Sequence, residues 1–391
     1  TSSSNTAIGY QSQNKLTSGD LNVSVGKGTL YTNTVGDRNV AVGTNALYYY
    51  NPASNEDSYN VAVGLNALNA NTVGKENTAL GGLAGSGITE GNQNVAVGTF
   101  ALDASTGTGS ANTGVGFRAL SANTSGGSNT ALGYQAGYTE TDADNNTAIG
   151  RNALRLNVNG DDNTAVGTYA LDANLESDNV AVGYAAATSN TTGQQNTALG
   201  YQALYTNVDG DKNTAVGYQA LYANTGNNNT AVGWQAGSDN IGGTSLTAVG
   251  YQAGKENSTG DSNTAIGTTA MYWNHHGERT TAVGAEAGYS FNPSDGVGDC
   301  TFVGYRAGYD SYQGAGHNTH IGSQAGKVGS SGEYNTSVGS HAFYSNALGD
   351  YNVAVGYKAL YTFNADTDTH GWNTAVGAQA GEGLTTGTYN T

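Results

Sequence analysis

The segment "NTAVGYQALYANTGNNNTAVGWQAG", residues 213–237, contains the same short sequence twice. The pentapeptide NTAVG at 213–217 returns at 229–233, and an aromatic residue, Gln and Ala follow each copy. Beyond these shared residues, the segment that follows the first copy differs in sequence from the segment that follows the second. This pattern predicts stacking: the repeated residues must match the coil above and below, whereas the residues between them face water and are free to vary.

The repeat runs through the whole chain. With its glycine as position 0, it occurs 22 times between Gly9 and Gly377, and 14 of the 21 spacings are 17 residues. A short fixed period is typical of a solenoid. We therefore predict an all-β, left-handed parallel β-solenoid or β-roll of about 22 coils of 17 residues, with residues 1–391 as one continuous array without separate domains. Longer outer loops are expected near 44–60, 285–300 and 357–373.

Two columns of the repeat are interpreted as the inward face of a strand. Position −1 is Val, Ile or Leu in all 22 repeats, and position −3 is Thr or Val in all 22. Residues two apart in a strand point to one face, and both columns have residue types that strands prefer. The residues expected inside the coil include Val216, Val232 and Ile266.

Asparagine occupies position −4 in 19 of 22 repeats. Stacked coils would bring these side chains to about the strand spacing of 4.8 Å, so they are expected to form a hydrogen-bonded ladder along the axis. Members of this ladder are Asn213, Asn229 and Asn263. The glycine at position 0 is expected at a corner that needs a positive φ or no Cβ. The six to ten residues before the next repeat, rich in Asn, Thr, Gly and Asp, are expected to form an exposed outer turn.

Position −2 is alanine in 17 of 22 repeats. Alternation along the strand would place this Ala column outside the coil, where a solvated face normally carries mixed polar residues. A strip of small apolar residues favours close cover by another copy of the chain, and closed symmetry favours a parallel homo-oligomer. The expected interface residues are Ala215, Ala231, Ala248 and Ala265.

Two known repeats look similar. The segments NVAVG at 39–43 and NTAIG at 5–9 resemble the N-S-V-A-I-G repeat of trimeric autotransporter adhesin heads, and NTAVGYQAL at 213–221 resembles repeats of bacteriophage tail-fibre proteins and bacterial surface fibres. The resemblance covers nearly the whole chain. In the adhesin heads the fold is a left-handed parallel β-roll with three chains side by side, so the resemblance implies a homotrimeric fibre. Adhesin coils are shorter than 17 residues, which implies a lengthened outer loop here.

Composition excludes several classes of protein. The 391 residues include 60 Gly and 2 Pro, and the net charge is −17, so nucleic acid is not an expected partner. The sequence has no run of 18 apolar residues, so no membrane insertion is expected. Cys300 is the single cysteine and forms no internal disulfide. The chain begins and ends within a repeat and shows no polar cap, which predicts either an excerpt of a longer fibre or end-to-end stacking of copies.

The repeat offers little for catalysis. No nucleophile, metalloprotease or phosphate-loop motif is present, so we expect neither an enzyme nor a cofactor. His320 lies in the Ala column, so three copies could meet at a trimer axis and bind a metal; Asp366 and Asp368 in a long loop are candidate Ca²⁺ ligands. Tyr201, Tyr218 and Tyr251 are expected to form a ladder of stacked rings on the surface. Its expected main role is to stabilise the coils, and binding of cell-surface glycans is a secondary one.

These observations favour an extracellular fibre shaft with an adhesive role, on a virion or a cell surface. One alternative is a self-assembling extracellular filament or matrix protein, which end-to-end contacts between copies would distinguish. A less favoured alternative is an ice-binding solenoid, because ice binders need an outward, flat Thr array and the Thr column is interpreted here as inward.

Overall fold

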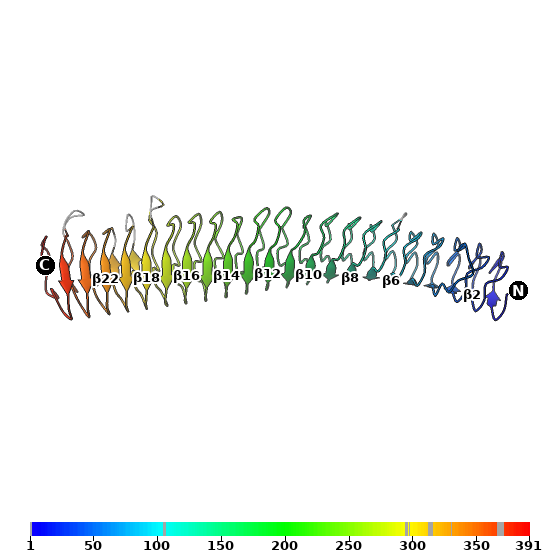
Figure 1. Ribbon diagram of the computed structural model, residues 1–391, viewed down its shortest axis with the longest axis horizontal. Helices are drawn as coiled ribbons and strands as arrows, with labels where there is room; N and C mark the ends of the chain where they lie inside the picture. Colours follow the sequence, from blue (N-terminus) through cyan, green and yellow to red (C-terminus); the bar gives the residue numbers. More distant parts are fainter. Residues whose placement is uncertain are drawn as a thin grey trace. The chain divides into compact units, whose positions relative to one another are not determined.

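The computed structural model shows an all-β parallel β-solenoid with about 17 residues per coil (Figure 1). It describes residues 2–104, 107–293, 296, 298–311, 316–329, 331–365 and 371–391. Contacts divide the chain into two compact units, residues 1–195 and 196–391, which are described separately below. The expectation of one continuous array and of left-handed coils stays a prediction.

Unit 1 stacks eleven three-residue strands in chain order. Each strand pairs in parallel with the next without offset, so that equivalent residues of the repeat face one another, as in Thr147 beside Thr164. The strands are β1 (Thr6–Ile8), β2 (Val23–Val25), β3 (Val40–Val42), β4 (Val61–Val63), β5 (Thr78–Leu80), β6 (Val95–Val97), β7 (Thr113–Val115), β8 (Thr130–Leu132), β9 (Thr147–Ile149), β10 (Thr164–Val166) and β11 (Val180–Val182).

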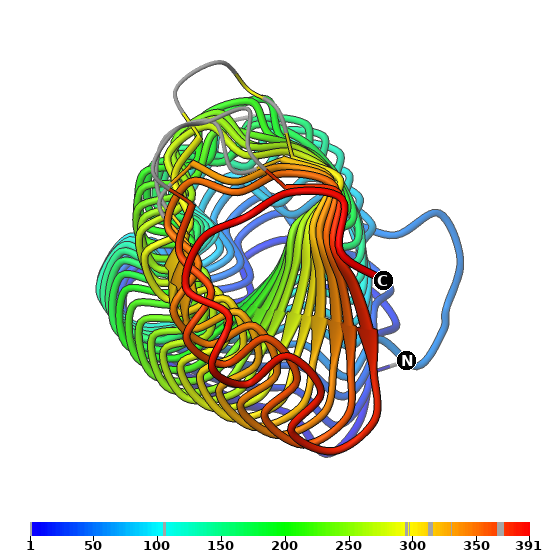
Figure 2. The same cartoon turned by 90° about the vertical axis from the view of Figure 1, so that its left-hand side faces the viewer.

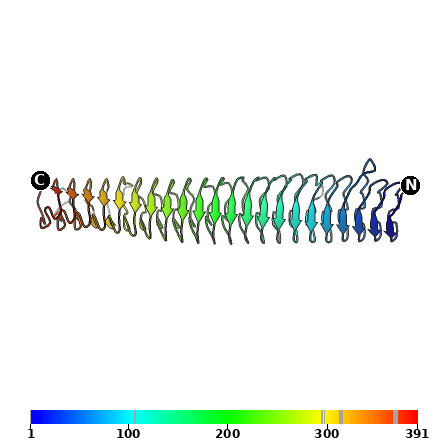
Figure 3. The ribbon, with the colours of Figure 1, turned by 60° about the horizontal axis from the view of Figure 1, so that its bottom comes forward.

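Unit 2 repeats this arrangement, with the strands side by side and pointing the same way (Figure 3). A two-residue pair, β19 (Asp310–Ser311) with β21 (Val328–Gly329), forms a second small sheet. The main strands are β12 (Thr197–Leu199), β13 (Thr214–Val216), β14 (Thr230–Val232), β15 (Thr247–Val249), β16 (Thr264–Ile266), β17 (Thr281–Val283), β18 (Thr301–Val303), β20 (Thr319–Ile321), β22 (Thr336–Val338), β23 (Val353–Val355) and β24 (Thr374–Val376).

From β2 onward, the middle residue of each three-residue strand is buried in the interior, which corrects the orientation expected from sequence. Ala215, Ala231, Ala248 and Ala265 are completely buried within a single chain. Their neighbours at position −1 point outward instead: Val232 is 39% and Ile266 38% exposed, and Val216 is partly exposed. The Ala column therefore cannot be an interface between chains, and Val216, Val232 and Ile266 are not core residues.

The interior is narrow because the turns bring small residues close to the strand. Alanines at position +3, such as Ala220 and Ala236, are also fully buried. A leucine at position +4, such as Leu221, enters the same space with a left-handed φ of 49°. A non-glycine residue with this φ is uncommon, and the burial of the leucine side chain offsets its strain. Only a small side chain fits at position −2 opposite such residues.

The glycine at position 0 is required at the corner, as predicted. Gly233 has a φ of +140°, and a Cβ there would lie 2.3 Å from the carbonyl oxygen of Gly250 in the next coil. Adjacent coils therefore approach each other through backbone at this corner, which leaves no room for a side chain.

The asparagines at position −4 link successive coils. The side-chain Oδ1 of Asn213 accepts the backbone N–H of Asn229 at 3.0 Å. The Nδ2 of Asn229 donates to the Gly243 carbonyl of the next coil at 2.9 Å, and Asn263 Oδ1 accepts the Thr280 N–H at 2.9 Å. The ladder thus joins each side chain to backbone groups, which keeps buried polar atoms satisfied.

A second buried asparagine ladder lies at position +7, in the segment that was expected to be an exposed turn. Asn240 Nδ2 donates to Asn224 Oδ1 at 2.8 Å, and Asn257 Nδ2 donates to Asn240 Oδ1 at 2.8 Å. The exposed-turn expectation is wrong for this column. The buried asparagines are Asn33, Asn71, Asn123, Asn157, Asn174, Asn190, Asn207, Asn224, Asn240, Asn257, Asn274 and Asn346.

Aromatic side chains replace this asparagine in the three longest repeats. Tyr50, Phe291 and Phe363 all occupy position +7 and are fully buried. Tyr50 lies against Gly36, where a Cβ would be 2.7 Å from its ring, and Phe291 lies in the same way against Gly277. These aromatic residues fill the coil interior.

Glu140 interrupts the second ladder in unit 1. It is fully buried, and neither of its carboxyl oxygens has a hydrogen-bond partner. Burial raises the pKa of this carboxyl to about 8. At neutral pH the folded chain therefore keeps Glu140 protonated, whereas the unfolded chain ionises it.

Substituting Glu140→Gln is expected to remove a pH dependence from the stability of unit 1. Because the folded pKa is raised, unfolding releases a proton between pH 4.5 and 8, so wild-type stability falls as pH rises through this window. The slope is about 1.4 kcal/mol per pH unit. Thermal unfolding of both proteins at pH 5, 6.5 and 8 checks this, with the exposed Glu90→Gln as the control. Parallel pH profiles for wild type and Glu140→Gln would contradict it.

Candidate functional site

The outward side of the sheet is the most regular surface in each unit. We call the side chains at positions −3 and −1 the sheet face. Figure 2 shows that the strands of unit 2 lie together on one side of the coil. Exposed members include Leu199 (46%), Val249 (36%) and Ile321 (38%). None of the 22 repeats has a charged residue at either position. The sheet face is therefore an uncharged strip of aliphatic and threonine side chains.

Aromatic residues at position +1 form a ladder in unit 2. Tyr218 stacks on Tyr201 with ring centroids 5.3 Å apart, and Trp234 stacks on Tyr218 at 5.5 Å and on Tyr251 at 5.1 Å. The planes of each pair lie within 9° of parallel. Each inner ring is thus covered on both faces by its neighbours. The ladder stabilises coil stacking and leaves ring edges, rather than ring faces, for a sugar.

A glutamine ladder follows this aromatic ladder at position +2. Gln219 Nε2 donates to Gln202 Oε1 at 3.0 Å, and Gln235 and Gln252 continue the chain of hydrogen bonds at 3.0 and 2.9 Å. Amide-to-amide bonds along the axis use the same groups that would otherwise bind a ligand. Most hydrogen-bonding groups of this glutamine ladder are therefore already paired within the chain.

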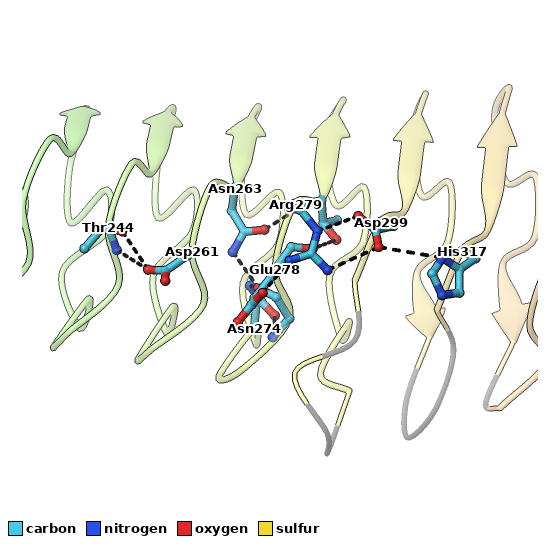
Figure 4. A network of polar contacts seen from close by, with 10 residues as sticks. Thr244, Asp261, Asn263, Asn274, Glu278, Arg279, Asp299 and His317 are labelled. Carbon is cyan, nitrogen blue, oxygen red and sulfur yellow. Dashed lines mark hydrogen bonds and ion pairs between the residues drawn. The ribbon is translucent and has the colours of Figure 1, made fainter.

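A second aromatic stack lies at position −5 near the end of unit 2. Tyr334 stacks between His317 at 4.7 Å and Tyr351 at 4.8 Å, and Tyr351 stacks on Trp372 at 4.3 Å. His317 also lies 3.7 Å from Asp299, which pairs with Arg279 at 2.7 Å (Figure 4). Hydrogen bonding with Arg279 lowers the pKa of Asp299, so this carboxylate is engaged as an ion-pair partner.

His320 lies inside the coil, which corrects its placement at an axis between chains. Its ring is 4% exposed and stacks on Phe302 with centroids 5.7 Å apart. Its Nδ1 lies 2.8 Å from Ser337 Oγ. Glycines leave room for both rings: a Cβ at Gly326 would lie 2.5 Å from the His320 ring, and Gly308 has the same relation to Phe302. Burial lowers the pKa of His320 to about 4, so this imidazole is neutral at pH 7.

The other metal candidates, Asp366 and Asp368, lie outside the described residues. Among the described residues, no group of three or more His, Cys, Asp or Glu side chains is placed to hold a metal ion. In the same part of the chain, no helix has the length and apolar character needed to cross a membrane.

Comparison with known sequences identifies no family for this chain. No protein-family model and no curated protein gives a significant match to the chain. The surfaces of the coil are therefore the features from which a function is inferred.

Proposed function

We propose that the chain is the shaft of an extracellular fibre in which three parallel copies lie side by side, with an adhesive role. The observation that carries the proposal is the sheet face, which keeps aliphatic or threonine side chains in every repeat and excludes charge from all of them. Continuous exposed apolar surface on this scale marks an interaction site, because leaving it in water is unfavourable. The same face of another copy has the matching repeat, which favours a symmetric homo-oligomer.

The proposal moves the interface from the Ala column to the sheet face but keeps the homotrimer that the adhesin resemblance implies. It assigns the chain no catalytic step and no cofactor. A self-assembling extracellular filament is the alternative, in which copies also join end to end. Electron micrographs of the purified chain distinguish the two, since a filament grows with protein concentration and a closed trimer keeps one length.

Replacing Val232 and Val249 together by arginine tests the interface. We expect the parent chain to have the mass of a trimer and the double variant that of a monomer, because paired arginines would be desolvated at the centre of the assembly. Light scattering measures the mass. The matched control is Asn227→Arg with Asn228→Arg, two exposed turn residues of the same unit, which should keep the parent mass. A monomeric parent, or a double variant of unchanged mass, would show that the sheet face is not the interface.

Ice binding is a second candidate, because the Thr column points outward. Sixteen of the 22 residues at position −3 are threonine. Parallel pairing without offset aligns them, as in Thr230, Thr247 and Thr264. Within the described residues, the hydroxyls of these three threonines make no hydrogen bond with the chain, so a regular water layer could form on them. A thermal-hysteresis measurement tests this function, and activity in a monomeric parent chain would favour it over the fibre.

A further inference from the structure

One repeat of unit 1 breaks the column at position +2. Gly28 is the only glycine among the 22 residues of this column, and its neighbours along the axis are Gln11 and Asn45. All three have a left-handed φ, of 67°, 59° and 56° respectively. The backbone therefore keeps the shape of the repeat at Gly28, while the side chain that other coils place here is missing.

The missing side chain leaves a groove of about 380 Å³ in unit 1, which we call the Gly28 groove. A Cβ on Gly28 would lie 2.7 Å from Asn45 Oδ1 and 3.3 Å from the Tyr48 ring, so a longer side chain would occupy this space. The volume is in the range of pockets that bind small molecules. At Gly28, therefore, no side chain enters the groove from position +2.

An exposed aromatic ring borders the groove. Tyr49 is 53% exposed and meets Tyr48 edge to face, with centroids 4.8 Å apart and planes at 75°. Tyr48 itself stacks on Tyr31 at 4.9 Å. Within the described residues no ring lies parallel to Tyr49, in contrast to the aromatic ladder of unit 2. Tyr49 can therefore accept an apolar ligand face against its π system.

Amide side chains form much of the remaining lining, and one of them is engaged: Asn69 Nδ2 donates to the Asn45 carbonyl at 3.1 Å. The side-chain amides of Gln11, Asn45 and Asn66 line the groove and make no hydrogen bond with the described part of the chain. Each offers both donors and an acceptor. Lys27 is the only cation that lines the groove, and no carboxylate lines it. This combination suits a ligand with many hydroxyl groups and one apolar face.

We propose that the Gly28 groove binds a saccharide. One pyranose face packs on Tyr49, because the C–H bonds of that face carry partial positive charge toward the negative ring face. The hydroxyl groups exchange hydrogen bonds with Gln11, Asn45 and Asn66, and Lys27 is in place to pair with the carboxylate of an acidic sugar. This site deepens the adhesive part of the proposed function and rests on it.

Saturation-transfer NMR on the full chain tests the site. The probes are the methyl glycosides of glucose, galactose, N-acetylglucosamine and glucuronic acid. Gly28→Gln fills the groove with the side chain that Gln11 already places in the same backbone conformation, so the variant should fold. Tyr49→Ala removes the ring. Trp273→Ala is the matched control, because Tyr272 and Trp273 occupy the same two positions of a coil in unit 2, with centroids 4.9 Å apart. In the coil before it, Gln252 fills the position that Gly28 has in unit 1.

We expect at least one glycoside to bind the wild-type chain and both groove variants to bind it about tenfold more weakly or not at all. Trp273→Ala should bind as the wild type does. The proposal is overturned if no glycoside binds, or if Gly28→Gln and Tyr49→Ala bind like the wild type. A mass measurement distinguishes failure of the saccharide site from failure of the proposed trimeric fibre. Gly28→Gln should retain the mass of the parent chain, whereas a monomeric parent chain would contradict the trimer.

Discussion

Replacing Ala231 by arginine is expected to unfold the coils around it, at a cost of several kcal/mol. Ala231 is fully buried, and its Cβ lies 3.7 Å from where a Cβ on Gly237 would be, so neither the volume nor the charge of arginine can be accommodated. Thermal and urea unfolding followed by circular dichroism measure the loss. Successive side chains of a strand point to opposite faces, so the same substitution at the next residue, Val232, is expected to have little effect on stability.

Val232→Arg is the matched control. Val232 is 39% exposed, so arginine there reaches water and should change the stability of the coil by no more than about 0.5 kcal/mol. Both variants are measured at concentrations below that at which the chain associates, because loss of a partner chain also lowers apparent stability. A larger loss for Val232→Arg than for Ala231→Arg would show that the strand faces are reversed.

The second large effect is expected from Asn224→Asp, a change of one atom in the second ladder. Asn224 Oδ1 accepts from Asn229 Nδ2 at 2.9 Å and from Asn240 Nδ2 at 2.8 Å, and its Nδ2 donates to the Gly226 carbonyl at 2.8 Å. Aspartate would turn a carboxylate oxygen toward that carbonyl and bury a charge. We expect a loss of about 3 kcal/mol or more at pH 7.

Two comparisons make this prediction specific to the ladder. Asn228→Asp, in the exposed part of the same turn, should cost no more than about 0.5 kcal/mol. Lowering the pH to 4 should recover part of the loss in Asn224→Asp, because protonation removes the buried charge. Urea unfolding at pH 7 and pH 4 measures both. Equal stability of the two variants at pH 7 would mean that Asn224 is not held in a buried ladder.

The sequence by itself determined the period, the position of each strand and the parallel stacking. In a solenoid the neighbour of each residue along the axis is its own equivalent in the next coil, so the columns of the repeat record that contact directly. Asparagine persists at position −4 because it satisfies backbone groups of the adjacent coil, as Asn213 does for Asn229. Glycine persists at position 0 because backbone approaches backbone there, as at Gly233.

Which side of the strand faces inward was decided only by the tertiary structure. Alternation separates Ala231 from Thr230 and Val232, but it does not say which set is inside, and a shift of one residue exchanges the faces. The narrow interior of the coil determines which set of side chains is buried. Left-handed residues in the turn after the strand, such as Leu221, bring the opposite wall so close that only a small side chain fits beside them.

The second ladder and the Gly28 groove also depended on the fold. The column of Asn224 stands seven residues after the repeat glycine, but asparagine is equally common in exposed turns, so the sequence alone does not show that this side chain is buried. Tyr50, Phe291 and Phe363 occupy the same column with a different chemistry, because longer turns leave more interior to fill. The groove arises where one side chain is missing from one column. A repeat describes what its copies share, whereas the proposed binding site lies where one copy differs.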